Sequence, residues 1–276
     1  MTGRGFILPG SEQKGVLLIH GLGGAPAEMR FLARRLHRGG FTVHVPQLAG
    51  HGADARTLLR TGWRDWLASA RGACFSLAAQ VEAVYVAGIC VGGALGLALA
   101  AEQPAIRGAA VYSMTFEFDG WSMPLWARAA PLIQLLADLP LLRRVRIAEP
   151  YPFGLKDAQL RRRACEGCGG FIEGALTHLP FGSLGQMYRL GRHIEHIGAG
   201  VRVPTLILHA REDDMSNPRN ARRLRAALGG RAEVRLLGDS YHMIHVDRQR
   251  ELVARMTGEF FGAPDAARAG GGIACA

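Results

Sequence analysis

Residues 86–94 read Val-Ala-Gly-Ile-Cys-Val-Gly-Gly-Ala, and this stretch decides the fold. An apolar, β-prone run at 84–87 leads into it, and small, helix-prone residues at 94–101 follow. The pattern is typical of a nucleophile elbow, in which a strand turns sharply into a helix and holds a reactive side chain at the turn. Glycines two positions to either side let strand and helix approach closely. The unusual residue is Cys90, because most such elbows carry Ser at the turn.

The sequence on both sides of the elbow alternates between strand-like and helix-like segments. Strand-like segments lie at 15–20, 41–45, 84–88, 108–112, 205–209 and 232–237, and the first of them is a continuous apolar run typical of a strand buried on both faces. Segments with helical periodicity lie at 26–38, 63–79, 91–102, 217–228 and 247–261. This order predicts an α/β fold, with a mostly parallel sheet and helices on both of its faces.

The alternation breaks off between residues 114 and 198. This region lacks a convincing parallel strand, and its helical stretches lie near 125–137, 156–165 and 183–195. We therefore predict an α/β core over 1–113 and 199–262, interrupted by an inserted helical cap over 114–198. The Gly- and Ala-rich tail, 263–276, is expected to be disordered.

Composition narrows the class of protein. The chain has 276 residues, and its 49% hydrophobic content suits a globular core of enzyme size. The formal charge of +10 comes mostly from scattered arginines without a nucleic-acid-binding signature, so we expect no nucleic-acid partner. An acidic acyl carrier would suit this charge. No apolar run is long enough to span a bilayer, and the first ten residues lack a signal-peptide core, so we predict a cytoplasmic protein without a transmembrane segment.

The five cysteines argue against a disulfide framework, because the count is odd and no secretion signal is present. Cys165 and Cys168 have the spacing of a CxxC motif, but no second pair lies near them. We interpret them as incidental thiols and predict no metal site, with a zinc or redox role as the alternative.

An elbow nucleophile needs a base and an acid that orients the base, and in this arrangement they follow in the order nucleophile, acid, base. Asp213 comes soon after the predicted strand 205–209, and His242 soon after the strand 232–237. Open α/β sheets bind their ligands at these carboxyl ends. We therefore predict that His242 takes the proton of Cys90 and that Asp213 fixes the tautomer of the imidazole.

Neighbouring residues offer alternatives for both roles. Asp214 and Glu212 are rival acids, and His245 is a rival base three residues beyond His242. Asp239 is interpreted as a turn or helix-cap residue.

Acyl chemistry also needs backbone N–H groups that stabilise an oxyanion. Val91 follows the nucleophile at the N-terminus of a predicted helix, where the helix dipole adds to the effect. The second donor in such sites comes from the loop after an early strand, and this makes Leu22 the candidate.

Several of these segments together resemble the α/β-hydrolase superfamily, above all bacterial carboxylesterases and monoacylglycerol lipases. The segments are 18–24 (LIHGLGG), 50–52 (GHG), 61–66 (TGWRDW), 88–93 (GICVGG), 210–218 (AREDDMSNP) and 240–242 (SYH). The resemblance covers residues 15–261 and implies a cap over an acyl pocket and no cofactor. Cys90 departs from it, since these esterases have Ser there. The cysteine elbow is similar to those of dienelactone hydrolases and polyhydroxyalkanoate synthases.

A cysteine nucleophile changes the expected substrate. Thiols are far stronger acids than alcohols, so a tetrahedral intermediate expels a thiolate more readily than an alkoxide. Thioesters, enol lactones and aryl esters avoid this reversal, because their leaving groups are good. We predict a hydrolase that cleaves a small carboxylic ester or thioester through an acyl-cysteine intermediate. The alternatives are an acyltransferase and a non-catalytic binding module on the same fold.

Overall fold

The computed structural model describes residues 5–166 and 172–263. Its centre is a seven-stranded sheet, in which every pairing is parallel except that of the first strand with the third. The order is β1 (Phe6–Leu8), β3 (Phe41–Val45), β2 (Ser11–Ile19), β4 (Ala83–Ile89), β5 (Ile106–Tyr112), β8 (Thr205–Ala210), β9 (Ala232–Leu237). The predicted α/β fold with a mostly parallel sheet is confirmed.

The register brings the ends of the central strands to one edge. Ile19 at the end of β2 is opposite Gly88 of β4, and Ile89 is opposite Tyr112 at the end of β5. Tyr112 in turn is opposite Leu208 of β8. The loops that follow these strands therefore leave the sheet side by side, which is what a site assembled from distant segments requires.

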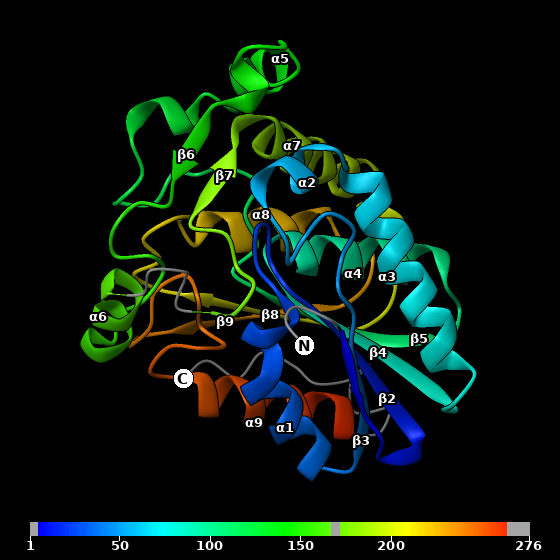
Figure 1. Cartoon of the computed structure of the whole chain (residues 1–276). Helices are drawn as coiled ribbons and strands as arrows, with labels where there is room; N and C mark the ends of the chain where they lie inside the picture. The colour runs from blue at the N-terminus through cyan, green and yellow to red at the C-terminus, as the bar shows by residue number, and fades with distance from the viewer. Residues whose placement is uncertain (1–4, 167–171, 264–276) are drawn as a thin grey trace.

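Helices cover both faces of the sheet (Figure 1). The helices α1 (Arg30–Arg38) and α9 (Arg250–Gly262) lie side by side on one face, and α3 (Trp63–Ala78), α4 (Val91–Glu102) and α8 (Arg219–Ala227) lie on the other. Short helical turns at η1 (Pro26–Met29) and α2 (Ala55–Leu59) precede α1 and α3. The predicted helix 26–38 thus begins with a 3₁₀ turn. The helix predicted over 247–261 begins at Arg250, three residues later than predicted.

Helix α4 is buried on every side along its first nine residues, 91–99. Its small side chains allow this, because α4 packs between the sheet and α7 (Phe181–Ile197). On the opposite face, Phe261 of α9 stacks on Tyr85 of β4 with ring centroids 4.8 Å apart. Both layers fix β4, and with it the position of the elbow.

Among the residues that the structure describes, the region between β5 and β8 contains three α-helices, three 3₁₀ turns and a small antiparallel pair of strands. In chain order these are η2 (Leu125–Arg128), α5 (Ala130–Leu136), η3 (Leu142–Arg144), β6 (Arg146–Ala148), α6 (Ala158–Glu166), β7 (His178–Pro180), α7 and η4 (Gly198–Gly200). Helix α5 and the strands β6 and β7 reach beyond the sheet in Figure 1, whereas α7 packs on α4. The cap boundaries at 114 and 198 stay a prediction.

Two further predictions concern the chain's ends and its cysteines. The tail from residue 264 onward lies outside the described residues, as does Cys168; Cys165 is exposed near the end of α6. None of the described helices is both long and apolar enough to cross a membrane.

Candidate active site

Cys90 stands at the turn between β4 and α4 in a backbone conformation that side chains rarely adopt, with φ 49° and ψ −111°. The flanking glycines are required by close contacts. A Cβ atom on Gly88 would lie 2.4 Å from the carbonyl carbon of Gly92, and one on Gly92 would lie 2.1 Å from the carbonyl oxygen of Ile19. The backbone N–H of Cys90 donates a hydrogen bond of 2.9 Å to the carbonyl of Tyr112. The elbow is therefore fixed by its neighbours on both sides.

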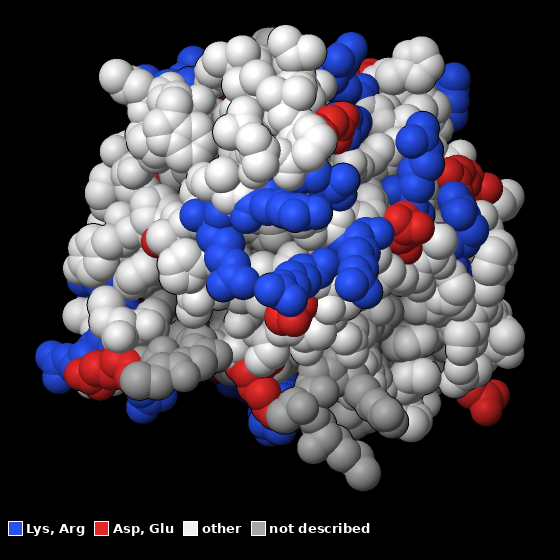
Figure 2. Space-filling model, turned by 45° about the horizontal axis from the view of Figure 1, so that its top comes forward, with Lys and Arg blue, Asp and Glu red and all other residues white. Residues whose placement is uncertain are grey.

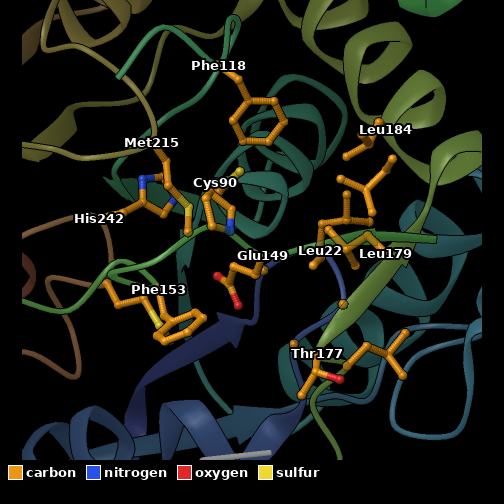
Figure 3. Close-up of a pocket in the computed structure, with 18 of the residues that line it drawn as sticks. Leu22, Cys90, Phe118, Glu149, Phe153, Thr177, Leu179, Leu184, Met215 and His242 are labelled. Atoms are coloured by element: carbon orange, nitrogen blue, oxygen red, sulfur yellow. The ribbon is translucent and has the colours of Figure 1, made fainter. Parts of the chain in front are cut away.

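The loops after β8 and β9 bring Asp213 and His242 together. Nδ1 of His242 lies 3.0 Å from Oδ2 and 3.1 Å from Oδ1 of Asp213. The backbone N–H groups of Met215 and Ser216 donate to Oδ1 of Asp213 at 2.9 and 2.7 Å, so the carboxylate cannot rotate freely. Figure 3 shows the imidazole of His242 beside the side chain of Cys90. With Nδ1 bound to the carboxylate, Nε2 is left for the thiol.

The electrostatics of this pair suit a proton acceptor. Burial alone lowers the pKa of His242, but the charge and hydrogen bond of Asp213, together with Cys90, outweigh burial and hold it well above its ordinary value. Burial likewise opposes the charge of Asp213, yet the neighbouring His242 keeps the pKa of this carboxyl below its ordinary value. An imidazolium formed during a reaction would thus be stabilised.

The rival residues lie elsewhere. Asp214 accepts hydrogen bonds from the backbone N–H groups of Gly154 at 3.0 Å and His242 at 3.1 Å, not from the imidazole. Glu212 pairs with Lys156 at 2.7 Å on the surface. His245 is fully buried, and its Nε2 lies 3.9 Å from Oε1 of Glu28. Asp214 therefore positions the loop that carries His242, while the other two lie outside the Asp213–His242 pair.

The predicted oxyanion donors flank the same space. Val91 is the first residue of α4, so helix geometry leaves its N–H without a partner inside the helix. Leu22 lies in the loop after β2 and lines the cavity that contains Cys90 and His242. A hydrogen bond fixes the position of this loop, because the N–H of Gly21 donates to Oε1 of Glu28 at 2.8 Å. The structure thus brings all five predicted site residues to one place.

Glu28 was not anticipated from the sequence, because it reads as an ordinary acid near the start of a helix. It is 6% exposed, and burial raises its pKa to about 7 despite its hydrogen bonds to the backbone. The folded protein thus holds the proton of Glu28 to a higher pH than the unfolded chain does, so this group's contribution to stability is lost as pH rises from about 4.5 to about 7.

We expect the substitution Glu28→Gln to reduce this loss of stability. Between pH 5 and pH 8, the free energy of unfolding of the wild type should fall by roughly 3 kcal/mol more than that of the variant. Urea unfolding of both proteins at the two pH values measures this difference, and the other titrating groups cancel between them. Parallel pH dependences in the two proteins would contradict the assignment.

The cavity beside Cys90 has a volume of about 280 Å³ and a mostly apolar wall. Its wall comes from the region between β5 and β8 and from the loops at the carboxyl edge of the sheet. The residues include Phe118, Met123, Trp126, Ile133, Phe153, Leu176, Leu179, Leu184, Met187 and Met215. Figure 3 shows several of them surrounding Cys90 and His242. Such a wall suits a hydrocarbon chain.

Besides Glu28, a second acid interrupts this apolar wall, and it is Glu149. Figure 3 shows its carboxyl group directed into the cavity on the side of Cys90 and His242. Burial and the charge of Asp214 raise the pKa of Glu149 to about 7, against the opposing effect of His242. No motif surrounds this residue in the sequence, so only the fold could identify it.

Comparisons with known proteins agree with this geometry. Residues 10–249 match the family described as serine aminopeptidase, S33. A thermostable monoacylglycerol lipase of Bacillus sp. (strain H-257) is 27% identical over 248 residues, which cover 90% of each chain. A carboxylesterase of Bacillus subtilis (strain 168) is 25% identical over 262 residues, covering 94% of this chain and 96% of the relative.

Solved structures show the same relationship. A structure from work on LipS and LipT, two metagenome-derived lipolytic enzymes, gives a TM-score of 0.79 at 25% identity and covers 95% of this chain and 98% of its own. The match to the family extends from β2 through the His242 loop, and so includes every residue of the site. This chain is therefore an esterase- and lipase-like hydrolase with the α/β-hydrolase fold, and it belongs to the S33 serine aminopeptidase family.

Proposed function

We propose that this protein hydrolyses carboxylic esters or thioesters through an acyl-enzyme intermediate on Cys90. The observation that carries the proposal is the position of the His242 imidazole, which is bound to Asp213 through Nδ1 and lies beside Cys90. The family description names a serine enzyme, so the cysteine nucleophile is specific to our proposal. Cys90 occupies the one position on the elbow from which an attacking atom reaches both the cavity and the base.

The reaction proceeds in two halves. His242 Nε2 takes the proton of the Cys90 thiol as Sγ attacks the carbonyl carbon of the substrate. The backbone N–H groups of Leu22 and Val91 stabilise the oxyanion. The intermediate then collapses: the bond to the leaving group breaks, and His242 returns the proton to the departing oxygen or sulfur. In the second half, His242 takes a proton from water, which attacks the thioester and releases the acid and the Cys90 thiol.

The cavity indicates the class of acyl group. Its apolar wall favours a hydrocarbon chain, and its volume of about 280 Å³ lies just below the range for ligand pockets, about 300–1,000 Å³. The relatives include a monoacylglycerol lipase and a carboxylesterase. We therefore propose short to medium acyl chains as substrates. Transfer of the acyl group to an amine, alcohol or carrier thiol stays the alternative, and analysis of products in the presence of such acceptors distinguishes it from hydrolysis.

The leaving group tests the role of the thiolate. We expect kcat/KM for an acyl thioester to exceed that for the matched alkyl ester by about tenfold or more, because a thiolate leaves as readily as Cys90 does. Cys90→Ser should keep the fold and shift the ratio toward the alkyl ester. Equal rates of the wild type on both substrates, or a serine variant inactive on both, would contradict the leaving-group argument.

A further inference from the structure

The outer surface of residues 121–146 is unusually rich in exposed apolar side chains. Leu141 is 85% exposed, Leu125 78% and Leu135 73%. Among the described residues, nine of the thirteen large apolar side chains that are exposed belong to this segment. Single exposed apolar residues are normal on a protein surface, whereas a continuous cluster marks an interaction site. We call residues 121–146 the apolar surface.

The charges within the apolar surface are almost all positive. It contains Arg128, Arg143, Arg144 and Arg146, and its one acid, Asp138, is paired with Arg189. Arg128, Arg144 and Arg146 are exposed and form no ion pair with any residue that the structure describes. Figure 2, in which the top of Figure 1 comes forward, shows basic side chains gathered next to a broad uncharged area.

The apolar surface is continuous with the wall of the catalytic cavity. Met123, Pro124 and Trp126 line the cavity, and Trp126 remains 45% exposed on the outside. Helix α5 is apolar on opposite sides, because Ile133 lines the cavity while Leu135, half a turn away, is 73% exposed. A helix that only covered a pocket would turn a polar face to water. The outer side of α5 therefore has the composition of a surface that contacts something apolar.

We propose that the apolar surface docks on an anionic lipid surface and places the mouth of the cavity next to the lipid. Leucine and tryptophan side chains enter the boundary between headgroups and acyl chains, and the unpaired arginines attract anionic headgroups. A second copy of this chain fits less well. In a two-fold dimer the same arginines would face one another across the interface. The exposed leucines and the arginines of the apolar surface do not line the cavity, so the docking does not depend on the proposed chemistry.

Vesicle flotation of the full chain tests the proposal. The wild type should float with phosphatidylcholine vesicles that contain about one third phosphatidylglycerol, less with pure phosphatidylcholine, and less at high salt. The double variant Leu135→Glu and Leu141→Glu should lower the partition coefficient at least tenfold. Arg144→Gln and Arg146→Gln should each lower it roughly fivefold on the anionic vesicles. Phe75→Glu is the matched control, because Phe75 is 55% exposed on α3, outside the apolar surface.

Hydrolysis of a short, water-soluble ester by each variant separates this proposal from the proposed function, since none of these residues lines the cavity. A variant that hydrolyses this ester at the wild-type rate but no longer floats with the vesicles would support docking. Two results would overturn it: no flotation of the wild type with anionic vesicles, or a Phe75→Glu effect as large as that of the double variant. Sedimentation provides the third decisive result, since a dimer that the double variant dissociates would assign the apolar surface to a second copy.

Discussion

Cys90→Ala is expected to lower kcat/KM on any acyl substrate by roughly 10⁴-fold or more, because the variant has no atom that can form the acyl-enzyme. The fold should survive, since the change removes only a sulfur atom at a position that is 7% exposed. Ester hydrolysis by the purified variant, with its circular dichroism spectrum as a check on folding, measures the effect.

The matched control is Cys165→Ala, which removes an exposed thiol on α6 without touching the cavity. This variant should keep wild-type activity. Intact mass spectrometry adds a direct readout: brief incubation of the wild type with a slow acyl substrate should add one acyl group, and Cys90→Ala should add none. More than a tenth of wild-type activity in Cys90→Ala would rule out Cys90 as the nucleophile.

The elbow could be predicted from the sequence because its constraint is local. Gly88 and Gly92 have no side chains since the backbones of α4 and β2 occupy the space where a Cβ would stand. The sheet was predictable for a similar reason, because strands buried on both faces must be apolar throughout. Together these patterns fixed where each strand ends, and hence where Asp213 and His242 would meet Cys90.

The wall of the cavity could not be predicted in this way. Glu149 and Phe153 reach the site through a region whose path depends on packing between distant segments, without a repeating pattern. The approach of Glu28 to His245 was also hidden: Glu28 reads as an ordinary polar position, and His245 stands out only as a rival base. The two residues lie 217 positions apart in the chain, and no single segment encodes their contact.

Asp213 and Asp214 illustrate a question that the sequence alone could not answer, namely which of the two acids binds the imidazole of His242. The two residues have the same chemistry and adjacent positions, but the loop after β8 turns their side chains in different directions. One carboxylate accepts from the imidazole of His242, and the other accepts from backbone N–H groups of His242 and Gly154. Ser113 also supports the loop after β9 that carries His242, since its hydroxyl donates to the carbonyl of His242 at 2.7 Å. Substitution of each acid in turn therefore separates catalysis from positioning.

Asp213→Asn is expected to lower kcat by roughly 10³- to 10⁴-fold, because an amide can donate to Nδ1 and so stabilise the wrong tautomer of His242. The loss of the carboxylate also removes what holds the pKa of His242 up, so burial should lower it and make the imidazolium harder to form. The pH dependence of kcat/KM reports this shift as an acidic limb that moves to lower pH, because His242 must be neutral to accept the thiol proton. Asp214→Asn is the matched control in size, charge and position.

Asp214→Asn should cost less than about tenfold in kcat, because its side chain does not touch the imidazole. Burial and the charge of Asp213 raise the pKa of Asp214 to about 6, so the wild-type group is destabilising once ionised and the amide removes this penalty above that pH. The amide keeps a carbonyl oxygen for one of the two backbone donors and loses the acceptor of the other, so we expect a moderate disturbance of the His242 loop. A larger loss of kcat in Asp214→Asn than in Asp213→Asn would reverse the assignment of the acid, and with it the reason for the raised pKa of His242.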